Sequence, residues 1–313
     1  MSGRKNENKR MKKKIGLALG SGAARGICHF GVIRALEEQN IRPDVICGTS
    51  VGALVGAAYV TGHLSALEDW FCEQTSRKML SHLDINLFAT GGIADGEKFI
   101  HFLKTKYGDY KIEDLPIPFA AITCDMSSGK EVWLTEGSIW DAVRASGAYP
   151  GLLSPVRREN QWLLDGGIVN PVPVSVCRAL GATHVIGVNL NHDILSPKEQ
   201  KDKEKSGLLN LDNTVLGKVR DRLKQSLTDR FSFNPKPKEY APGILDVISC
   251  TVNIMQDRIT RSRLAGDPAD VIFNPRLSHI GFLETEKAID IIEEGKKCVL
   301  RNAEQLAHLH DDD

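Results

Sequence analysis

The folded part of the chain opens with two consecutive strand–turn–helix units. Residues 14–19 form an apolar strand that stops at the glycine turn 20–22, and apolar residues at helical spacing follow over 25–40. A short buried strand at 44–47 leads through a second turn into a helix rich in alanine and glycine at 50–61. Because parallel strands are joined by such helices, the pattern predicts a parallel sheet covered on both faces.

Later segments extend this sheet. A strand at 118–124 is followed by an expected antiparallel neighbour at 130–134, across a Ser-Ser-Gly turn. The remaining strands are expected at 161–164, 185–190 and 270–273, and the remaining helices at 138–146, 171–180, 245–264 and 284–306. Together these elements predict an α/β protein: a three-layer α/β/α sandwich with a mostly parallel central sheet.

Two segments fall outside this rhythm. Residues 1–13 form a basic tail, for which two interpretations stay open: a solvated disordered segment, or weak attraction to anionic lipid headgroups. Residues 192–242 are a polar segment with one amphipathic stretch at 208–227, which suits either a surface insertion or a lid. We expect residues 14–313 to form a single domain that carries this insertion.

Composition excludes some functional classes. Forty Lys and Arg residues balance forty Asp and Glu residues, so net charge gives no argument for a nucleic-acid partner. The seven cysteines are scattered without a CxxC pair, which is typical of a reducing compartment and predicts a cytoplasmic location, with peripheral membrane contact as an open possibility. No run of about 18 to 20 apolar residues is present, so no membrane span is expected.

The pentapeptide Gly48-Thr49-Ser50-Val51-Gly52 lies between the second strand and its helix. A serine at this place must turn sharply, and glycines two residues before and after it keep the crowded backbone free of side chains. Its hydroxyl oxygen then lies at a helix amino terminus, whose dipole favours developing negative charge. The motif therefore predicts that Ser50 is a nucleophile.

The first turn, residues 20–26, exposes unpaired amide groups at the start of a helix and is a candidate oxyanion site. A dinucleotide-binding loop is excluded, because Gly20, Gly22 and Gly26 do not give the GxGxxG spacing and Asp44 opens the second strand instead of ending it. Arg25 is expected either to hold a phosphate-bearing headgroup or to form a salt bridge with a carboxylate.

A nucleophilic serine also needs a base. A conventional α/β-hydrolase would use a histidine, for which His184, His192 and His279 follow Ser50 in the chain. The stronger candidate is Asp165, which ends an apolar strand and precedes two glycines, although many Asp-Gly pairs are simple turns.

In this order the three motifs resemble the patatin-like phospholipase family, and more closely its compact bacterial branch. The resemblance spans roughly residues 14–190 and, more loosely, 246–300. It is carried by the glycine-rich loop ending in Arg25-Gly26, by Gly48 to Gly52 with the helix that follows, by Ala145-Ser146 through Pro150-Gly151-Leu152, and by Asp165-Gly166-Gly167-Ile168-Val169-Asn170.

The resemblance implies a Ser-Asp dyad that hydrolyses acyl esters of phospholipids, lysophospholipids or related lipids, without a metal or cofactor. Ser50 is then the nucleophile, Asp165 the base, and the amides of Gly22 and Ala23 the oxyanion hole. The residues expected to support these motifs are Gly20, Arg25, Gly26, Gly48, Gly52, Gly166 and Gly167.

The glycine-rich loop departs from the family at Ser21 and Ala23, where glycine is common. A positive φ at Ala23 would cost about 1 kcal/mol, so the loop either avoids that conformation or forms a somewhat altered hole. Two other functions stay open: a Ser-His-Asp esterase acting on soluble esters, and a catalytically silent regulatory protein with the same fold. The sequence does not predict an oligomeric state.

Overall fold

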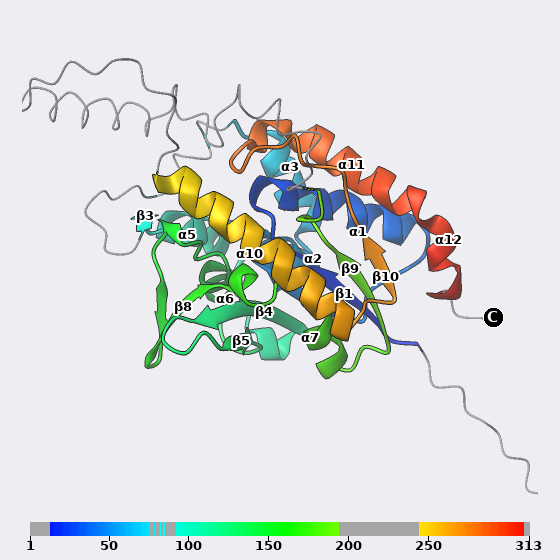
Figure 1. Ribbon diagram of the computed structural model, residues 1–313, viewed down its shortest axis with the longest axis horizontal. Coiled ribbons are helices and arrows are strands. Elements are labelled where there is room, and N and C mark those ends of the chain that lie inside the picture. The colour runs from blue at the N-terminus through cyan, green and yellow to red at the C-terminus, as the bar shows by residue number, and fades with distance from the viewer. Residues whose placement is uncertain are drawn as a thin grey trace, which may run out of the picture.

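The computed structural model describes residues 13–75, 78, 82, 84, 92–193 and 244–309. A central mixed sheet carries helices on both faces, which confirms the expected α/β/α sandwich (Figure 1). The strand order is β10, β9, β1, β2, β4, β8 and β7, and β5 also pairs with β4. The strands of this sheet are β1 (Ile15–Leu19), β2 (Val45–Thr49), β4 (Phe119–Asp125), β5 (Glu131–Leu134), β7 (Val156–Arg158), β8 (Gln161–Asp165), β9 (His184–Val188) and β10 (Val271–Phe273).

Strand direction divides the sheet into two parts. The run from β10 through β9, β1 and β2 to β4 is parallel throughout. Beyond it β8 and β5 pair antiparallel with β4, and β7 pairs antiparallel with β8. The antiparallel neighbour expected at 130–134 is therefore confirmed as β5.

Helices cover both faces of the central sheet. The principal helices are α1 (Cys28–Glu38), α2 (Val51–Val60), α3 (Leu64–Cys72), α5 (Glu97–Tyr107), α6 (Ile139–Ser146), α7 (Val174–Ala179), α10 (Ile244–Gly266), α11 (Ala288–Arg301) and α12 (Ala303–Leu306). α1 and α11 pack side by side, and α10 crosses the opposite face of the sheet (Figure 1). A small separate sheet joins β3 (Gly92–Ala94) to β6 (Gly151–Leu153).

Alternation along the strands feeds two cores. In β1, Leu17 and Leu19 pack into the core shared with α1, α2 and α11. Ala18, between them, faces the smaller core beneath α7. Both faces of the strand are thus buried, as expected where helices cover a parallel sheet on both sides.

Two helix predictions need correction. The helix expected at 171–180 begins only at Val174, with Pro173 as its N-cap, because the prolines precede the helix instead of occupying its first turn. The helix expected at 284–306 is divided: a 3-10 turn (Thr285–Lys287) precedes α11, and Asn302 separates α11 from α12. The sequence also carries a signal for the unpredicted α5, since Ile100, Leu103 and Tyr107 recur on its buried side.

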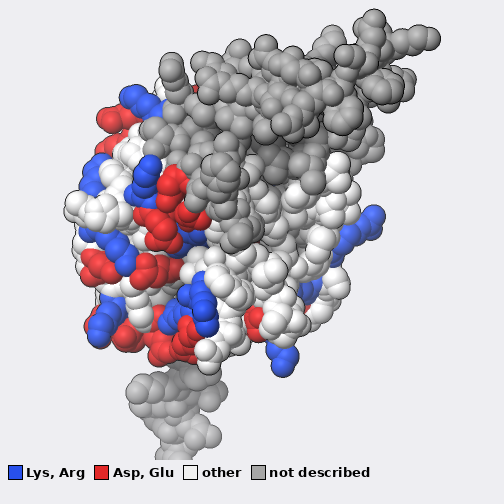
Figure 2. All heavy atoms as spheres, turned by 90° about the vertical axis from the view of Figure 1, so that its left-hand side faces the viewer, with Lys and Arg blue, Asp and Glu red and all other residues white. Residues whose placement is uncertain are grey.

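Several expectations fall outside the described residues: almost all of the basic tail 1–13, and nearly the whole 192–242 insertion with its lid interpretation. In the described part of the chain, no helix is long and apolar enough to cross a bilayer. Figure 2 shows acidic and basic side chains side by side on one face, with a less charged area next to them. This mixture fits the balanced charge of the whole sequence.

Candidate active site

Ser50 stands at a strained turn between β2 and α2. Its backbone has φ 58° and ψ −123°, a left-handed φ that a residue with a side chain rarely adopts. Packing explains the flanking glycines. A β-carbon at Gly48 would lie 2.5 Å from the Ala53 nitrogen, and one at Gly52 would collide with the Leu19 carbonyl oxygen. The close approach of α2 to β1 and β2 therefore requires glycine at both positions.

Hydrogen bonds from distant segments hold this turn. The Ser50 amide donates to the Ser146 hydroxyl at 2.9 Å, and that hydroxyl donates to the Ile122 carbonyl at 2.6 Å. The Thr49 hydroxyl donates to the carbonyl of Asn170 at 2.9 Å. The serine turn is thus fixed to α6, to β4 and to the loop after β8.

The sheet register brings Asp165 to Ser50. Thr49 of β2 pairs with Ile122 of β4, and the next residue of β4, Thr123, pairs with Asp165 of β8. Asp165 was expected at the carboxyl end of a strand, and it lies there. However, β8 runs antiparallel to β4, so its carboxyl end reaches the site from the opposite direction to the parallel strands.

The environment of Asp165 raises its proton affinity. The side chain is 1% exposed, and burial raises its pKa from 3.8 to about 6. The Ser50 hydroxyl and the Gly167 amide oppose this shift, and the Gly167 amide donates to Oδ1 at 2.7 Å. In the described part of the chain, Oδ2 accepts no completed hydrogen bond. The Ser50–Asp165 contact is therefore looser than a completed hydrogen bond, as catalytic pairs often are before substrate binds.

The glycine-rich loop has two unused amides. Within the described part of the chain, the amides of Gly22 and Ala23 donate no hydrogen bond. The amides on either side are all used, donating to backbone carbonyls at 2.9 to 3.1 Å: Gly20 to Val188, Ser21 to Pro171, Ala24 to Phe282, and Arg25 to Gly22. Ala23 adopts φ 50°, so the loop does enter the left-handed region despite its β-carbon.

A buried histidine supports this loop. His29, in the first turn of α1, lies with Nε2 2.8 Å from the carbonyl oxygen of Gly20. Burial lowers the pKa of His29 to about 4, so the ring is neutral at physiological pH. Because a carbonyl oxygen can only accept, Nε2 carries the proton and donates it. The sequence offered no sign of this contact beyond the position of His29 on a buried helix.

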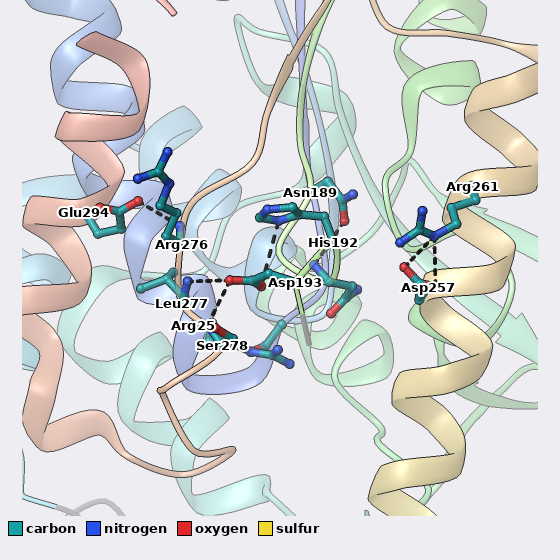
Figure 3. Close-up of polar contacts among 12 residues, drawn as sticks. Arg25, Asn189, His192, Asp193, Asp257, Arg261, Arg276, Leu277, Ser278 and Glu294 are labelled. Carbon is teal, nitrogen blue, oxygen red and sulfur yellow. Dashed lines mark hydrogen bonds and ion pairs between the residues drawn. The ribbon is translucent and has the colours of Figure 1, made fainter. Parts of the chain in front are cut away.

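The side chain of Arg25 contacts the glycine-rich loop. It is buried, and its Nε donates to the Gly22 carbonyl at 3.2 Å. Burial lowers the pKa of Arg25 to about 10, and the charge of Asp193 opposes that shift. In Figure 3, Asp193 accepts hydrogen bonds from the amides of Leu277 and Ser278, both at 3.1 Å. No ion pair joins Arg25 to a carboxylate within the described residues, so the expected salt bridge is not formed.

The histidines considered for a triad lie elsewhere. His184 is the first residue of β9 and lies at the amino-terminal end of the parallel strands, whereas Ser50 lies at their carboxyl-terminal end. It contacts the Thr183 hydroxyl at 3.0 Å. His192 forms a 3.8 Å ion-pair contact with Asp193, and burial lowers its pKa. His279 lies near Glu284. Among the described residues, no histidine hydrogen-bonds to Ser50 or Asp165.

An apolar cavity of about 170 Å³ opens beside Ser50. Its walls come from η1 (Ala23–Ile27), α2, α3, α5, α6 and β6, and from the chain before α11. Much of the lining is large and apolar, including Ile27, Leu54, Phe71, Phe99, Leu152 and Phe282. Such a wall suits a hydrocarbon chain better than a sugar or a nucleotide.

Comparison with known proteins gives a consistent result. The model of the family described as patatin-like phospholipase matches residues 17–178. An uncharacterized NTE family protein of Mycobacterium bovis is 31% identical over 322 residues, covering 90% of this chain and 89% of that protein. Lysophospholipase NTE1 of Pyricularia oryzae is 28% identical over 298 residues, covering 94% of this chain but only 19% of that protein. An alignment with the crystal structure of VipD from Legionella pneumophila covers 96% of this chain and 81% of VipD, at 13% identity and a TM-score of 0.38.

Proposed function

The chain belongs to the patatin-like phospholipase family, and on this basis we propose that it hydrolyses acyl esters of phospholipids or lysophospholipids through a Ser50–Asp165 dyad. Membership of the family makes it a lipid ester hydrolase by class. The catalytic residues and the type of lipid are the proposal.

One observation carries the dyad: a buried carboxylate with an unpaired oxygen lies beside a serine at a strained turn. Asp165 accepts the hydroxyl proton of Ser50 as Oγ attacks the ester carbonyl. A pKa of about 6 suits this role, because the carboxylate is ionised near neutral pH and still basic enough to take a proton. The absence of a histidine contact in the described residues favours the dyad over a triad.

The unused amides of Gly22 and Ala23 are the proposed oxyanion hole. Both precede or open η1, and an oxyanion held there would gain two charge-assisted hydrogen bonds. The alcohol or lysolipid leaves with the proton held by Asp165. Water then attacks the acyl-enzyme and gives a proton to Asp165. Asp165 passes that proton to Ser50 Oγ as the bond between Oγ and the acyl carbon breaks, which releases the fatty acid and restores the serine hydroxyl.

The apolar cavity supports a lipid substrate rather than a short soluble ester. Phe71, Phe99 and Leu152 line it from three elements, α3, α5 and β6, so a fatty acyl chain attached at Ser50 would be removed from water. The Pyricularia oryzae relative, a lysophospholipase by name, is consistent with this class.

Peripheral contact with a membrane is part of the same proposal. On α10 the outward side chains of Val247, Ile254 and Met255 are exposed and apolar. Exposed apolar side chains on an amphipathic helix are suited to contact with lipid. We expect the protein to sediment with anionic phospholipid vesicles, and replacing these three residues by serine to weaken that binding. Unchanged sedimentation would contradict the contact.

A lipid panel tests the function directly. Phospholipids, lysophospholipids, acylglycerols and short water-soluble esters would be incubated with the wild type and with Ser50→Ala, and the released fatty acids measured by mass spectrometry. We expect release from lipids by the wild type, and none above background by Ser50→Ala. Turnover of soluble esters alone would favour the conventional esterase. A folded wild type without any turnover would favour the silent regulatory protein.

A further inference from the structure

Tyr149 is a cavity residue that the dyad mechanism does not use. It follows α6 and is 7% exposed, and it lines the same cavity as Ser50. Its ring packs on Phe282 with centroids 4.7 Å apart. Its carbonyl accepts the amides of Leu152 and Leu153, both at 3.0 Å, so the backbone at this position is fixed.

Among the described residues, the phenol oxygen of Tyr149 has no hydrogen-bond partner, although it is buried. The hydroxyl of Ser249, on α10, lies near enough to lower the pKa of the phenol, but no completed hydrogen bond joins them. A buried tyrosine usually pairs its hydroxyl, because an unpaired polar group in an apolar site destabilises the fold. An unpaired hydroxyl at a substrate cavity is therefore best explained by a partner that arrives with the substrate.

Tyr149 also lies on the Asp165 side of the site. The Asp165 amide donates to the carbonyl of Ala148, the residue before Tyr149, at 3.0 Å. Burial, and after it the charge of Asp165, raises the pKa of the phenol above its ordinary value. The hydroxyl therefore stays protonated at working pH and serves as a donor.

We propose that the Tyr149 hydroxyl donates a hydrogen bond to the alcohol oxygen of the scissile ester as that oxygen leaves. This inference rests on the proposed function, in which the amides of Gly22 and Ala23 hold the carbonyl oxygen. The leaving oxygen must face Asp165, because Asp165 holds the proton taken from Ser50, and Tyr149 lies on that side.

The proton balance is unchanged by this donor. The bond between the acyl carbon and the alcohol oxygen breaks, and the oxygen takes the bonding electron pair. Asp165 returns to that oxygen the proton it received from Ser50. Tyr149 keeps its own proton and stabilises the negative charge that develops before transfer is complete.

The test uses Tyr149→Phe, which keeps the ring on Phe282 and removes only the hydroxyl. Two esters of the same fatty acid are compared, one with glycerol and one with p-nitrophenol, by kcat/KM, which reports the acylation step. We expect about a tenfold loss on the glycerol ester, the size of one hydrogen bond, and less than about a twofold loss on the nitrophenyl ester. The nitrophenolate needs little help because it is already a stable anion.

A matched control separates this role from a structural one. Tyr110 lies outside the cavity, and its hydroxyl contacts Nε2 of His63 at 3.0 Å. Tyr110→Phe should lower the melting temperature and leave the ratio of the two kcat/KM values unchanged. Tyr149→Phe should not lower the melting temperature, because the hydroxyl that it removes is unpaired.

Equal losses on both esters, no loss on either, or a lowered melting temperature in Tyr149→Phe would overturn the proposal for Tyr149. A wild type that hydrolyses neither ester nor any lipid of the panel would instead overturn the proposed function, and the role of Tyr149 with it. The two failures are distinguishable because only the second abolishes wild-type turnover.

Discussion

The turns at 20–26 and 48–52 have the same construction, but they differ in whether the backbone amide of the strained residue is hydrogen-bonded. Each joins a buried parallel strand to a helical segment, and each places one non-glycine residue at positive φ, Ala23 at 50° and Ser50 at 58°. At Ser50 the backbone amide donates to the Ser146 hydroxyl, and the side-chain hydroxyl is the proposed nucleophile. At Ala23 the side chain is a methyl group and the amide is left unused.

The difference indicates how one backbone device can present two kinds of chemistry. A strained residue persists only where its surroundings over-determine it, and both turns are pinned by carbonyls or hydroxyls of other segments. In the serine turn the strained backbone presents a side-chain hydroxyl, and in the glycine-rich turn it presents backbone amide hydrogens. We therefore expect activity to depend on different groups in the two turns: on the side chain in the serine turn, and on the position of the backbone amides in the glycine-rich turn.

The largest effect is expected from Asp165→Asn, which removes the proposed base that the serine turn needs. Turnover should fall by about a thousandfold, because an amide cannot accept the Ser50 proton. The thermal stability of Asp165→Asn should instead exceed that of the wild type above about pH 6. Folding raises the pKa of Asp165 from 3.8 to about 6, so ionisation destabilises the fold increasingly as pH rises from about 4 to about 6, and fully above that.

At pH 8 the Asn variant should therefore melt at a higher temperature than the wild type, by an amount corresponding to at most about 3 kcal/mol. At pH 4 the two should melt alike. Thermal melts at both pH values check this sign. Full turnover in Asp165→Asn would mean that Asp165 is not the base that accepts the Ser50 proton.

A smaller effect is expected from Gly22→Ala in the other turn. Gly22 has an extended backbone at φ 178°, so its conformation does not demand glycine. The packing of Leu190 against this position does require glycine, because a β-carbon at Gly22 would lie 2.6 Å from Leu190 Cδ1. The loop must shift, and displaced amides should lower kcat by about 10- to 100-fold.

Leu190→Ala in the Gly22→Ala background provides the control. It removes Cδ1 and Cγ but leaves Leu190 Cβ at 2.9 Å from the new β-carbon, so it relieves only part of the clash. It should therefore restore part of the lost kcat, at a cost in stability because Leu190 is fully buried. If the double variant were no more active than Gly22→Ala, steric displacement of the amides would not be the cause.

The smallest effect is expected from Ala23→Gly, which restores the glycine common in the family. Only the amide is proposed to contact substrate, so kcat should stay within about twofold of the wild type. Removing the β-carbon at φ 50° relieves strain of about 1 kcal/mol, partly offset by the greater freedom of glycine in the unfolded chain. Urea unfolding should therefore show a small gain in stability. A loss of activity beyond tenfold would show that the methyl group matters.

The sequence predicted the placement of those parts of the candidate site that depend on local patterns. The serine turn follows from two glycines at fixed spacing between a strand and a helix, and Asp165 from its place at a strand end. The antiparallel direction of β8 did not follow, because an apolar strand reads the same whether it runs parallel or antiparallel to its neighbour.

The supporting contacts could not be predicted, because they join segments far apart in the chain. Ser146 lies 96 residues after Ser50, whose amide it accepts. His29 appears in the sequence as one more member of a buried helix, and only the fold shows that it donates to Gly20. Tyr149 lies within the segment 145–152 that resembles the family. Its proposed role depends on a hydroxyl without a hydrogen-bond partner among the described residues, which a sequence pattern cannot show.

If Asp165 alone activates Ser50, the rate at which a fluorophosphonate modifies Ser50 should depend on the ionisation of Asp165, and this rate is the most direct test of the dyad. Measured against pH, the wild-type rate should rise through about pH 6 and then level off, following ionisation of Asp165. Asp165→Asn should lose both the rate and its pH dependence, while His192→Ala should keep both. A wild-type rate in Asp165→Asn, with the loss falling on a histidine variant instead, would contradict the dyad.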